Sequence, residues 1–439
     1  MSTQSPTPPG LGDGNRPCLG IVAGGGRLPL MIAESVAARG EAVHIVAIEG
    51  EADPEVARFP HTWVNWGQVG RMVATLRNEG AQELVIAGAV KRPNLWHIRP
   101  DAGFFRSLPR IVSLLGGGDD SVLTRVVRFF EQQGLNVRGV HEVAPDLLAG
   151  AGPLGGVALA AADRADAEIG FAVRHALGPV DAGQAVVVVA GKVVAIEGAE
   201  GTDAMLERVG DLSGRGGLAI GRGVLAKGPK PRQERRVDLP AIGPRTIEQV
   251  AAAGLAGVVV EAGAVLILDR AQVIAAADSA NCAVYGLEPV AQAETGRRTG
   301  VLIGRVIARR RPRRRDVADI VTGLAAVEGL AAFGTGASAV VVRNFLLAIE
   351  GGEGAPAMLE RAGKLRQWGL RWRKVGVLVR RAEGRAEDAG ALGALFSQAA
   401  SQELAGIAVT GAADALAPYE DAARLADDLG LFLVLCEGA

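Results

Sequence analysis

The segment from Lys227 to Gly243, KGPKPRQERRVDLPAIG, concentrates the residue types that handle phosphate esters. Five cations fall within its first ten residues, and Gln233, Glu234 and Asp238 lie among or just beyond them. Three prolines forbid a continuous helix, so we expect a stiffened loop. Cations in such a loop can bind phosphate oxygens, while a carboxylate holds a metal ion or a water. A solvated charged loop is the alternative interpretation.

A second candidate group lies in EGAEGTDAML, residues 197–206, where an apolar run gives way to a helical pattern. Glu200, Thr202 and Asp203 are predicted to face the same phosphate or metal ion. The alternative is that Thr202 or Asp203 only caps the helix.

Three further turns follow apolar runs in the first third of the chain. A glycine turn can present backbone N–H groups to a phosphate at a helix N-terminus, although this one is not the dinucleotide pattern GxGxxG. The other turns offer two cations and a pair of carboxylates. The candidate residues are Gly24, Gly25, Gly26, Leu28 and Pro29 in the first turn, Gly88, Lys91 and Arg92 in the second, and Asp119 and Asp120 in the third.

The elements around these turns predict a parallel, doubly wound sheet. Apolar runs at Leu19–Ala23, Ala42–Ile48 and Glu83–Gly88 alternate with helical patterns, which is typical of α/β folds. Ligands bind such sheets outside the carboxyl ends of the strands, where the three turns lie.

The middle of the chain has a different pattern. Two β-branched stretches, Ala185–Gly198 and Gly257–Arg270, each contain a central glycine and predict β-hairpins. With helical patterns between them, they indicate a smaller α+β domain.

The last third of the chain repeats this middle part. Residues 337–365 align with 183–212 and share the string AIEG, followed by AMLER. The repeat keeps its apolar pattern but loses its polar residues: Pro356 stands for Asp203, Arg380 for Lys227, and 386–396 for the stretch with Arg236 and Asp238. We therefore predict a degenerate second copy that folds without catalysing.

These patterns divide the chain into five parts. We expect a disordered tail at 1–16, the sheet domain at 17–150, the domain with the catalytic loop at 151–290, a basic linker at 291–315 and the degenerate copy at 316–439. The arginine-rich linker is either solvated or a patch for anionic lipid. Nucleic acid is a third option, but no aromatic residues for stacking interleave the arginines.

Composition restricts the function. The net charge of −1 argues against nucleic acid as a partner. Three dispersed cysteines without CxxC predict buried free thiols, and no apolar run is long enough to span a membrane. We expect a cytoplasmic protein. Patterns typical of dinuclear metallophosphoesterases, Nudix enzymes, P-loop proteins and GxSxG hydrolases are absent from the sequence.

Seven strings in order resemble the UDP-2,3-diacylglucosamine pyrophosphatases of LpxI type: IVAGGGRLP, AGAVKRP, GDDSVLTRV, GVHEV, EGTDAML, GVLAKGPKPRQERRVDLPAIG and AGLAGVVVEAG. The resemblance covers about residues 18–289 and implies a two-domain plan. It also implies hydrolysis of UDP-2,3-diacylglucosamine to UMP and 2,3-diacylglucosamine 1-phosphate, with Mg²⁺ as the usual metal and water attacking the α-phosphorus.

The resemblance also implies residue roles. By this resemblance we expect Asp238, in the family's DLP motif, to be the catalytic residue and a metal ligand, with Asp203 and Glu200 as further metal ligands. Lys227, Lys230, Gln233, Arg236 and Thr202 are implied contacts to the substrate. The partner is a lipid-linked UDP-sugar, so peripheral contact with the inner membrane stays open, as does the choice between monomer and homodimer.

The extra copy departs from the family. We expect it to replace a partner domain within the chain or to cover the acyl groove, with a tolerated relic as the plainer alternative. Two other functions stay open from the residues alone: a non-catalytic nucleotide- or lipid-binding regulator, and an oxidoreductase suggested only by the glycine turn.

Overall fold

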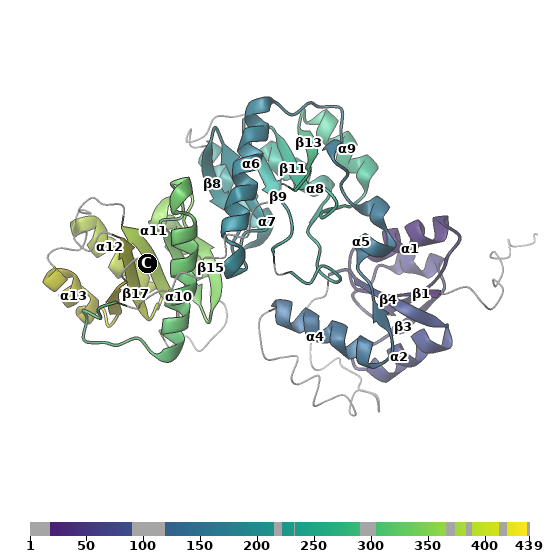
Figure 1. Ribbon diagram of the computed structural model, residues 1–439, viewed down its shortest axis with the longest axis horizontal. Coiled ribbons are helices and arrows are strands. Elements are labelled where there is room, and N and C mark those ends of the chain that lie inside the picture. Colours follow the sequence, from purple (N-terminus) through teal and green to yellow (C-terminus); the bar gives the residue numbers. More distant parts are fainter. Residues whose placement is uncertain are drawn as a thin grey trace, which may run out of the picture. The chain divides into compact units, whose positions relative to one another are not determined.

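The computed structural model describes residues 18–89, 119–214, 222–231, 233–289, 304–365, 374–382, 389–411 and 419–436 (Figure 1). The chain divides into two compact units. Unit 1 contains the residues up to Leu148 together with Gln233–Ala241 and Leu266–Leu268, and unit 2 contains the rest. A boundary was expected near residue 150, but the two later segments that join unit 1 were not.

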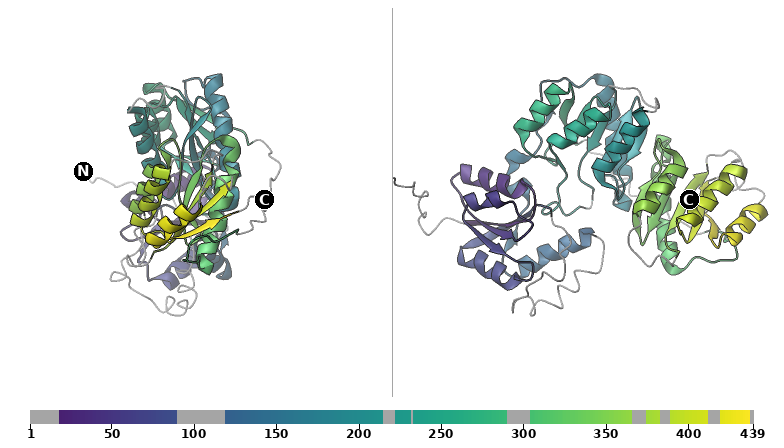
Figure 2. Two further views of the ribbon diagram at one scale, coloured as in Figure 1. Left: turned by 90° about the vertical axis from the view of Figure 1, so that its left-hand side faces the viewer. Right: turned by 180° about the vertical axis from the view of Figure 1, so that it is seen from behind.

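Unit 1 is built on a five-stranded sheet in the order β3-β2-β1-β4-β5, and every described pairing in it is parallel. The predicted parallel sheet is thereby confirmed. Helices α1 and α5 pack on one face, and α2 and α4 on the other. Figure 2 shows α1 and α2 on opposite sides of this sheet in the view from behind. The elements are β1 (Cys18–Ala23), α1 (Leu28–Ala38), β2 (Ala42–Ile48), β3 (His61–Val64), α2 (Val69–Asn78), β4 (Ala81–Ala87), α4 (Asp119–Gln132), β5 (Asn136–Val137) and α5 (Val140–Val143).

Unit 2 contains two sheets, of which the first, here the middle sheet, has the order β6-β13-β11-β9-β7-β8. Its central strands β9, β11 and β13 are parallel, and β7 and β8 form an antiparallel hairpin. The elements are β6 (Gly152–Pro153), α6 (Ala161–Ala176), β7 (Ala185–Val189), β8 (Lys192–Ile196), α7 (Gly201–Gly214), β9 (Val224–Lys227), α8 (Pro244–Ala252), β11 (Gly257–Glu261), α9 (Arg270–Ser279) and β13 (Ala283–Leu287).

The two hairpin predictions had opposite outcomes. The hairpin within Ala185–Gly198 is confirmed by the pairing of β7 with β8. The hairpin within Gly257–Arg270 is wrong, because β11 lies between two parallel neighbours and β12 (Leu266–Ile267) pairs instead with β10 (Ala241–Ile242). The centre of the middle sheet is therefore α/β in character, and only its edges fit the α+β description.

The second sheet of unit 2, here the C-terminal sheet, has the order β15-β14-β16-β17-β18. Order and strand direction match β8-β7-β9-β11-β13, and Ser338 lies opposite Arg380 as Ala185 lies opposite Lys227. The elements are α10 (Arg314–Gly329), β14 (Ser338–Val342), β15 (Phe345–Ile349), α11 (Gly354–Leu365), β16 (Val377–Ala382), α12 (Ala389–Ser401), β17 (Gly406–Gly411), α13 (Tyr419–Asp428) and β18 (Phe432–Leu435).

The second part of the expected basic linker is tied to this sheet. The Ile307 N–H donates to the Leu433 carbonyl at 3.0 Å, and the Leu435 N–H donates to the Arg305 carbonyl at 2.9 Å. Residues 305–307 therefore extend the C-terminal sheet. Residues 291–303 lie outside the described part of the chain.

Two other expectations concern cysteines and membrane spans. All three cysteines are free; Cys282 and Cys436 are buried as predicted, while Cys18 is partly exposed. Among the described residues, no helix combines the length and apolar character needed to cross a membrane.

Candidate functional site

The loop from Lys227 to Gly243 contributes to both units. Its start lies in unit 2, and Gln233–Ala241 lies in unit 1. The loop therefore takes part in two polar groups, which we describe separately. We name them the Asp238 cluster in unit 1 (Glu131, Gln233, Glu234, Arg236 and Asp238) and the Lys227 cluster in unit 2 (Arg174, Glu197, Thr202, Lys227 and Glu261).

A tight turn and a buried amide position the carboxylate of Asp238. The N–H groups of Val237 and Asp238 both donate to the Glu234 carbonyl, at 3.1 and 3.0 Å. Gln233 is 6% exposed, and its Nε2 donates to Oδ2 of Asp238. Because the donor is buried and the acceptor is charged, this bond fixes the direction of the carboxylate.

Arg236 is surrounded by carboxylates. Its guanidinium donates to both oxygens of Glu234, each at 2.8 Å, and to Glu131 of α4, also at 2.8 Å. These bonds hold the pKa of Glu234 below its ordinary value. Two carboxylates therefore already offset the positive charge of Arg236, the residue that was predicted to contact the substrate.

Apolar residues on either side of Asp238 anchor the turn. Val237 packs against the cluster formed with α2 and α4, whereas Leu239 packs against the cluster formed with α1 and α5. The N–H of Leu266 in β12 donates to the Pro240 carbonyl at 2.9 Å. The DLP motif is thus held by packing as well as by hydrogen bonds.

His141 was not singled out as a candidate from the sequence, yet it lies beside this turn. A Cβ on Gly139 would come within 2.4 Å of the His141 ring nitrogen Nδ1 and 3.2 Å of Arg236 Cα, so Gly139 permits a close approach. The His141 Nδ1 is buried without a hydrogen-bond partner among the described residues, and burial lowers the pKa of the ring. The string GVHEV, quoted for the family resemblance, was the available signal.

The glycine turn after β1 is joined to the end of β4. Gly24 and Gly25 donate their N–H groups to the carbonyls of Ala87 and Ala89, at 2.8 and 2.6 Å. Gly88 has φ of +95°, and a Cβ there would lie 2.7 Å from the Gly25 carbonyl oxygen. Three of the predicted phosphate-binding glycines thus have a structural role that the sequence did not reveal.

The other turn residues are placed only in part. Gly26, with φ of +85°, precedes α1, which begins at Leu28 with Pro29 in its first turn. Asp119 and Asp120 are the first residues of α4. Lys91 and Arg92 lie outside the described residues. Substrate binding by all of these residues stays a prediction.

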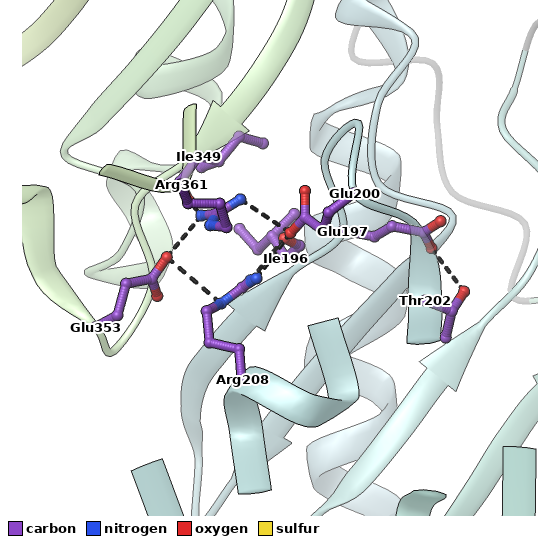
Figure 3. A network of polar contacts seen from close by, with 8 residues as sticks. All are labelled: Ile196, Glu197, Glu200, Thr202, Arg208, Ile349, Glu353 and Arg361. Carbon is purple, nitrogen blue, oxygen red and sulfur yellow. Dashed lines mark hydrogen bonds and ion pairs between the residues drawn. The ribbon is translucent and has the colours of Figure 1, made fainter. Parts of the chain in front are cut away.

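The Lys227 cluster lies at the carboxyl edge of the parallel strands in the middle sheet. Lys227 ends β9 and Glu261 ends β11. Lys227 is 8% exposed; burial lowers its pKa, and attraction to Glu197 opposes that shift. Burial likewise raises the pKa of Glu197, which accepts a hydrogen bond from the Thr202 hydroxyl at 3.1 Å (Figure 3).

Buried Arg174 completes this cluster and supports the start of the loop. It donates to the Pro229 carbonyl at 2.6 Å and lies 3.5 Å from the Glu261 carboxylate. A Cβ on Gly228 would lie 2.6 Å from the guanidinium, so the glycine of KGPK permits this contact. Lys230 pairs with Asp181 at 3.7 Å.

The two further carboxylates predicted as metal ligands, Glu200 just before α7 and Asp203 in its first turn, have different surroundings. Asp203 is exposed and lies 3.4 Å from Arg245. The side chain of Glu200 is 4% exposed, and its Oε1 accepts from Arg208 at 2.7 Å and from Arg361 at 2.9 Å. Their roles as metal ligands stay predictions, but the contacts of Glu200 favour a structural role. Within the described ranges, no three His, Cys, Asp or Glu side chains form a metal-binding group.

A hollow in unit 2 lies away from these residues. It has a volume of about 670 Å³ and is lined mainly by small residues at the amino ends of β11 and β13. Lys227 and Glu261 are at the opposite ends of their strands. We therefore do not assign the substrate to this hollow.

Comparison with known proteins identifies the family. The family model described as the LpxI N-terminal domain matches residues 18–147, and that of the LpxI C-terminal domain matches residues 150–285 and 304–434. UDP-2,3-diacylglucosamine pyrophosphatase LpxI of Caulobacter vibrioides is 44% identical over 273 residues, which are 62% of this chain and 98% of that protein. These matches span both units and include the DLP turn, so the chain belongs to the LpxI family.

Proposed function

We propose that this chain hydrolyses UDP-2,3-diacylglucosamine to UMP and 2,3-diacylglucosamine 1-phosphate, a step of lipid A synthesis. The name of the Caulobacter relative supports the substrate. The observation that carries the proposal is the Asp238 carboxylate, held by the buried Gln233 amide within an anchored turn. A carboxylate fixed in this way is suited to direct a water or hold a metal ion at a phosphate.

Magnesium is the metal that we propose. Mg²⁺ is usually held by one or two carboxylates, with water and substrate phosphates completing its shell, so it does not require a three-ligand group. Asp238 fits this requirement, with Asp203 as a further candidate. When bound, the ion would neutralise charge that develops on the phosphate oxygens.

The chain's own residues would perform the remaining tasks. Gln233 holds the Asp238 carboxylate in one orientation, and Glu234 and Glu131 hold the Arg236 guanidinium. In our proposal Lys227, Lys230, Arg236 and Thr202 contact the substrate, and water attacks the α-phosphorus.

Product analysis tests this proposal. Purified protein with UDP-2,3-diacylglucosamine and Mg²⁺ should release UMP, whereas Asp238→Ala and Asp238→Asn should release little. In water enriched in ¹⁸O, attack at the α-phosphorus places the label in UMP. Label in the sugar phosphate would refute the site of attack, and no UMP from the wild type, or equal release by the variants, would refute the function.

The cellular setting follows from the same substrate. We propose a cytoplasmic enzyme that meets its acylated substrate at the surface of the inner membrane. Sedimentation with anionic phospholipid vesicles would show bound protein, and protein left in the supernatant at low salt would contradict the membrane contact.

A further inference from the structure

A ring of four charged residues joins the middle region of unit 2 (residues 149–232, 242–265 and 269–289) to its C-terminal region (residues 304–436). Glu200 pairs with Arg208 at 2.7 Å and with Arg361 at 2.9 Å; Glu353 pairs with Arg361 at 2.6 Å and with Arg208 at 3.5 Å (Figure 3). Both glutamates are 4% exposed, and the two arginines are 13% and 14% exposed. Charges this buried are tolerated only because each has opposite charges around it.

The ring is symmetric under exchange of the two regions. Glu353 lies 153 positions after Glu200, and Arg361 lies 153 positions after Arg208. Each arginine also donates to the carbonyl of the last residue of the edge strand in its own region, Arg208 to Ile196 and Arg361 to Ile349. The carbonyl acceptors have the same spacing.

Backbone hydrogen bonds between the two regions have the same symmetry. The Ala199 N–H donates to the Leu347 carbonyl at 3.1 Å, and the Gly352 N–H donates to the Val194 carbonyl at 2.7 Å. Ala199 and Gly352 are 153 positions apart, as are Val194 and Leu347. Two bonds related in this way are the signature of an approximate twofold axis between similar domains.

The apolar contacts are continuous across this axis. One core cluster contains Leu177 and Leu330, which are counterparts, with Val180 and Phe333 packed against it. A Cβ on Gly329 would lie 3.1 Å from the carbonyl oxygen of its own counterpart, Ala176. Such self-contacts occur where an isologous interface crosses its axis.

We propose that the C-terminal region is a built-in partner: it occupies, within one chain, the surface through which two copies of the middle region would pair. The interface has a shared apolar core, which is typical of a permanent association, and the charged ring is buried beside it. The partner lacks the Asp238 turn, so each pair carries one catalytic loop. The chain then needs no second copy to cover this surface.

The built-in partner also positions part of the Lys227 cluster. Its contacts reach Gly198, Ala199 and Glu200, which connect Glu197 to Thr202; a Cβ on Gly198 would lie 2.8 Å from the Leu347 carbonyl oxygen. The path of the chain between two polar residues of that cluster is therefore set from the C-terminal region. This positioning does not depend on which substrate the enzyme hydrolyses.

Cutting the folded chain tests the pairing without any activity assay. A specific protease site inserted between Pro289 and Gly304 allows the intact protein to be cut after folding. We expect the two pieces of the wild type to elute together at the mass of the uncut 45.1 kDa chain when light scattering is recorded at low micromolar concentration. Pieces that separate under native conditions would overturn the proposal.

A charge reversal provides the matched test. Arg361→Glu places a carboxylate against Glu200, so the cut pieces should separate and Tm of the uncut variant should fall. Amide exchange at Ala199 should then become at least tenfold faster, since its N–H loses the Leu347 acceptor. Cut pieces of this variant that stay together, with Ala199 still protected, would contradict the proposal.

A milder pair covers the case in which the charge reversal does not fold. Glu200→Gln and Glu353→Gln remove counterpart charges, so symmetry predicts that the two variants lower Tm by similar amounts. A loss confined to one of them would refute the exchange symmetry on which the inference rests.

Discussion

Replacing Gln233 with Met should lower kcat for UMP release by about 10- to 100-fold. Methionine has a similar length and can fill the same buried position, but it has no N–H to donate. Gln233 is 6% exposed, and its amide donates a hydrogen bond to the Asp238 carboxylate. The substitution therefore removes one defined interaction and leaves the packing of the turn largely intact.

The magnitude follows from the type of bond that is lost. Hydrogen bonds to charged groups contribute about 1.5–3 kcal/mol. A factor of ten in rate corresponds to about 1.4 kcal/mol, so a carboxylate that loses its fixed direction in the transition state should cost about one to two powers of ten. The full loss applies only if this orientation is needed for the chemical step.

The assay is initial-rate UMP release with Mg²⁺, together with thermal unfolding to show that the variant is folded. Gln398→Met serves as the control, because the Gln398 amide donates to the Pro356 carbonyl at 2.7 Å in the C-terminal region, which lacks the Asp238 turn. The control should keep the wild-type rate. A folded Gln233→Met protein with kcat within twofold of wild type would refute the orienting role.

Three other changes test the surrounding structure. Arg236 holds the pKa of Glu234 below its ordinary value near 4.5, so this ion pair stabilises the fold above that pH, and its contribution is lost as the pH falls through the lowered pKa. Glu234→Gln should therefore narrow the difference in the free energy of urea unfolding between pH 7 and pH 3. An unchanged difference would contradict the role of this pair. Gly88→Ala should lower the free energy of urea unfolding by about 1–3 kcal/mol, because φ is +95° and the new Cβ would clash with the Gly25 carbonyl oxygen. An unchanged free energy of unfolding would show that the turn can shift to accept the Cβ. Lys227→Met removes the cation that attracts Glu197 most and should cost roughly 3 kcal/mol in urea unfolding. The cost should shrink as the pH falls toward the raised pKa of Glu197, because a protonated carboxyl needs no cation; a cost independent of pH would exclude the pairing.

The sequence predicted well those features that depend on local pattern. The strand Ala42–Ile48 was predicted at its observed bounds. The hairpin of β7 and β8 was predicted correctly because its two strands are neighbours in the sequence and are joined by a short turn. The segment Gly257–Arg270 failed because two β-branched runs around a glycine do not reveal their partners. The backbone of β11 is paired instead by two parallel strands that are distant in sequence.

The site showed the same division. A loop that would carry the phosphate chemistry could be selected from residue types alone, since cations, an amide and carboxylates occur together between prolines. The partners of its residues could not be selected in this way. Glu131 lies 105 positions before Arg236, and His141 lies beside Arg236 only because Gly139 lets the α5 turn approach closely.

Glu200 shows why closeness in sequence at the start of a helix is a poor guide to a shared ligand. Its nearness in sequence to Thr202 and Asp203 suggested a common ligand. The side chain instead meets Arg208 of its own region and Arg361 of the other, a contact that only the tertiary structure brings about. A repeat alignment at constant spacing would have paired Glu200 with Glu353 and Arg208 with Arg361, and this was the unused signal.

The discontinuous composition of unit 1 affects how the protein can fold during synthesis. Leu266 belongs to the same core cluster as Ile21 and Val140, and Leu239 packs against it. The sheet of unit 1 is translated early, but its core is closed by residues that leave the ribosome only after most of the middle region. We therefore expect part of one apolar face of the nascent N-terminal sheet to stay uncovered until these later residues are synthesised. Asp238 reaches its final position only when the segment that contains it packs on this sheet.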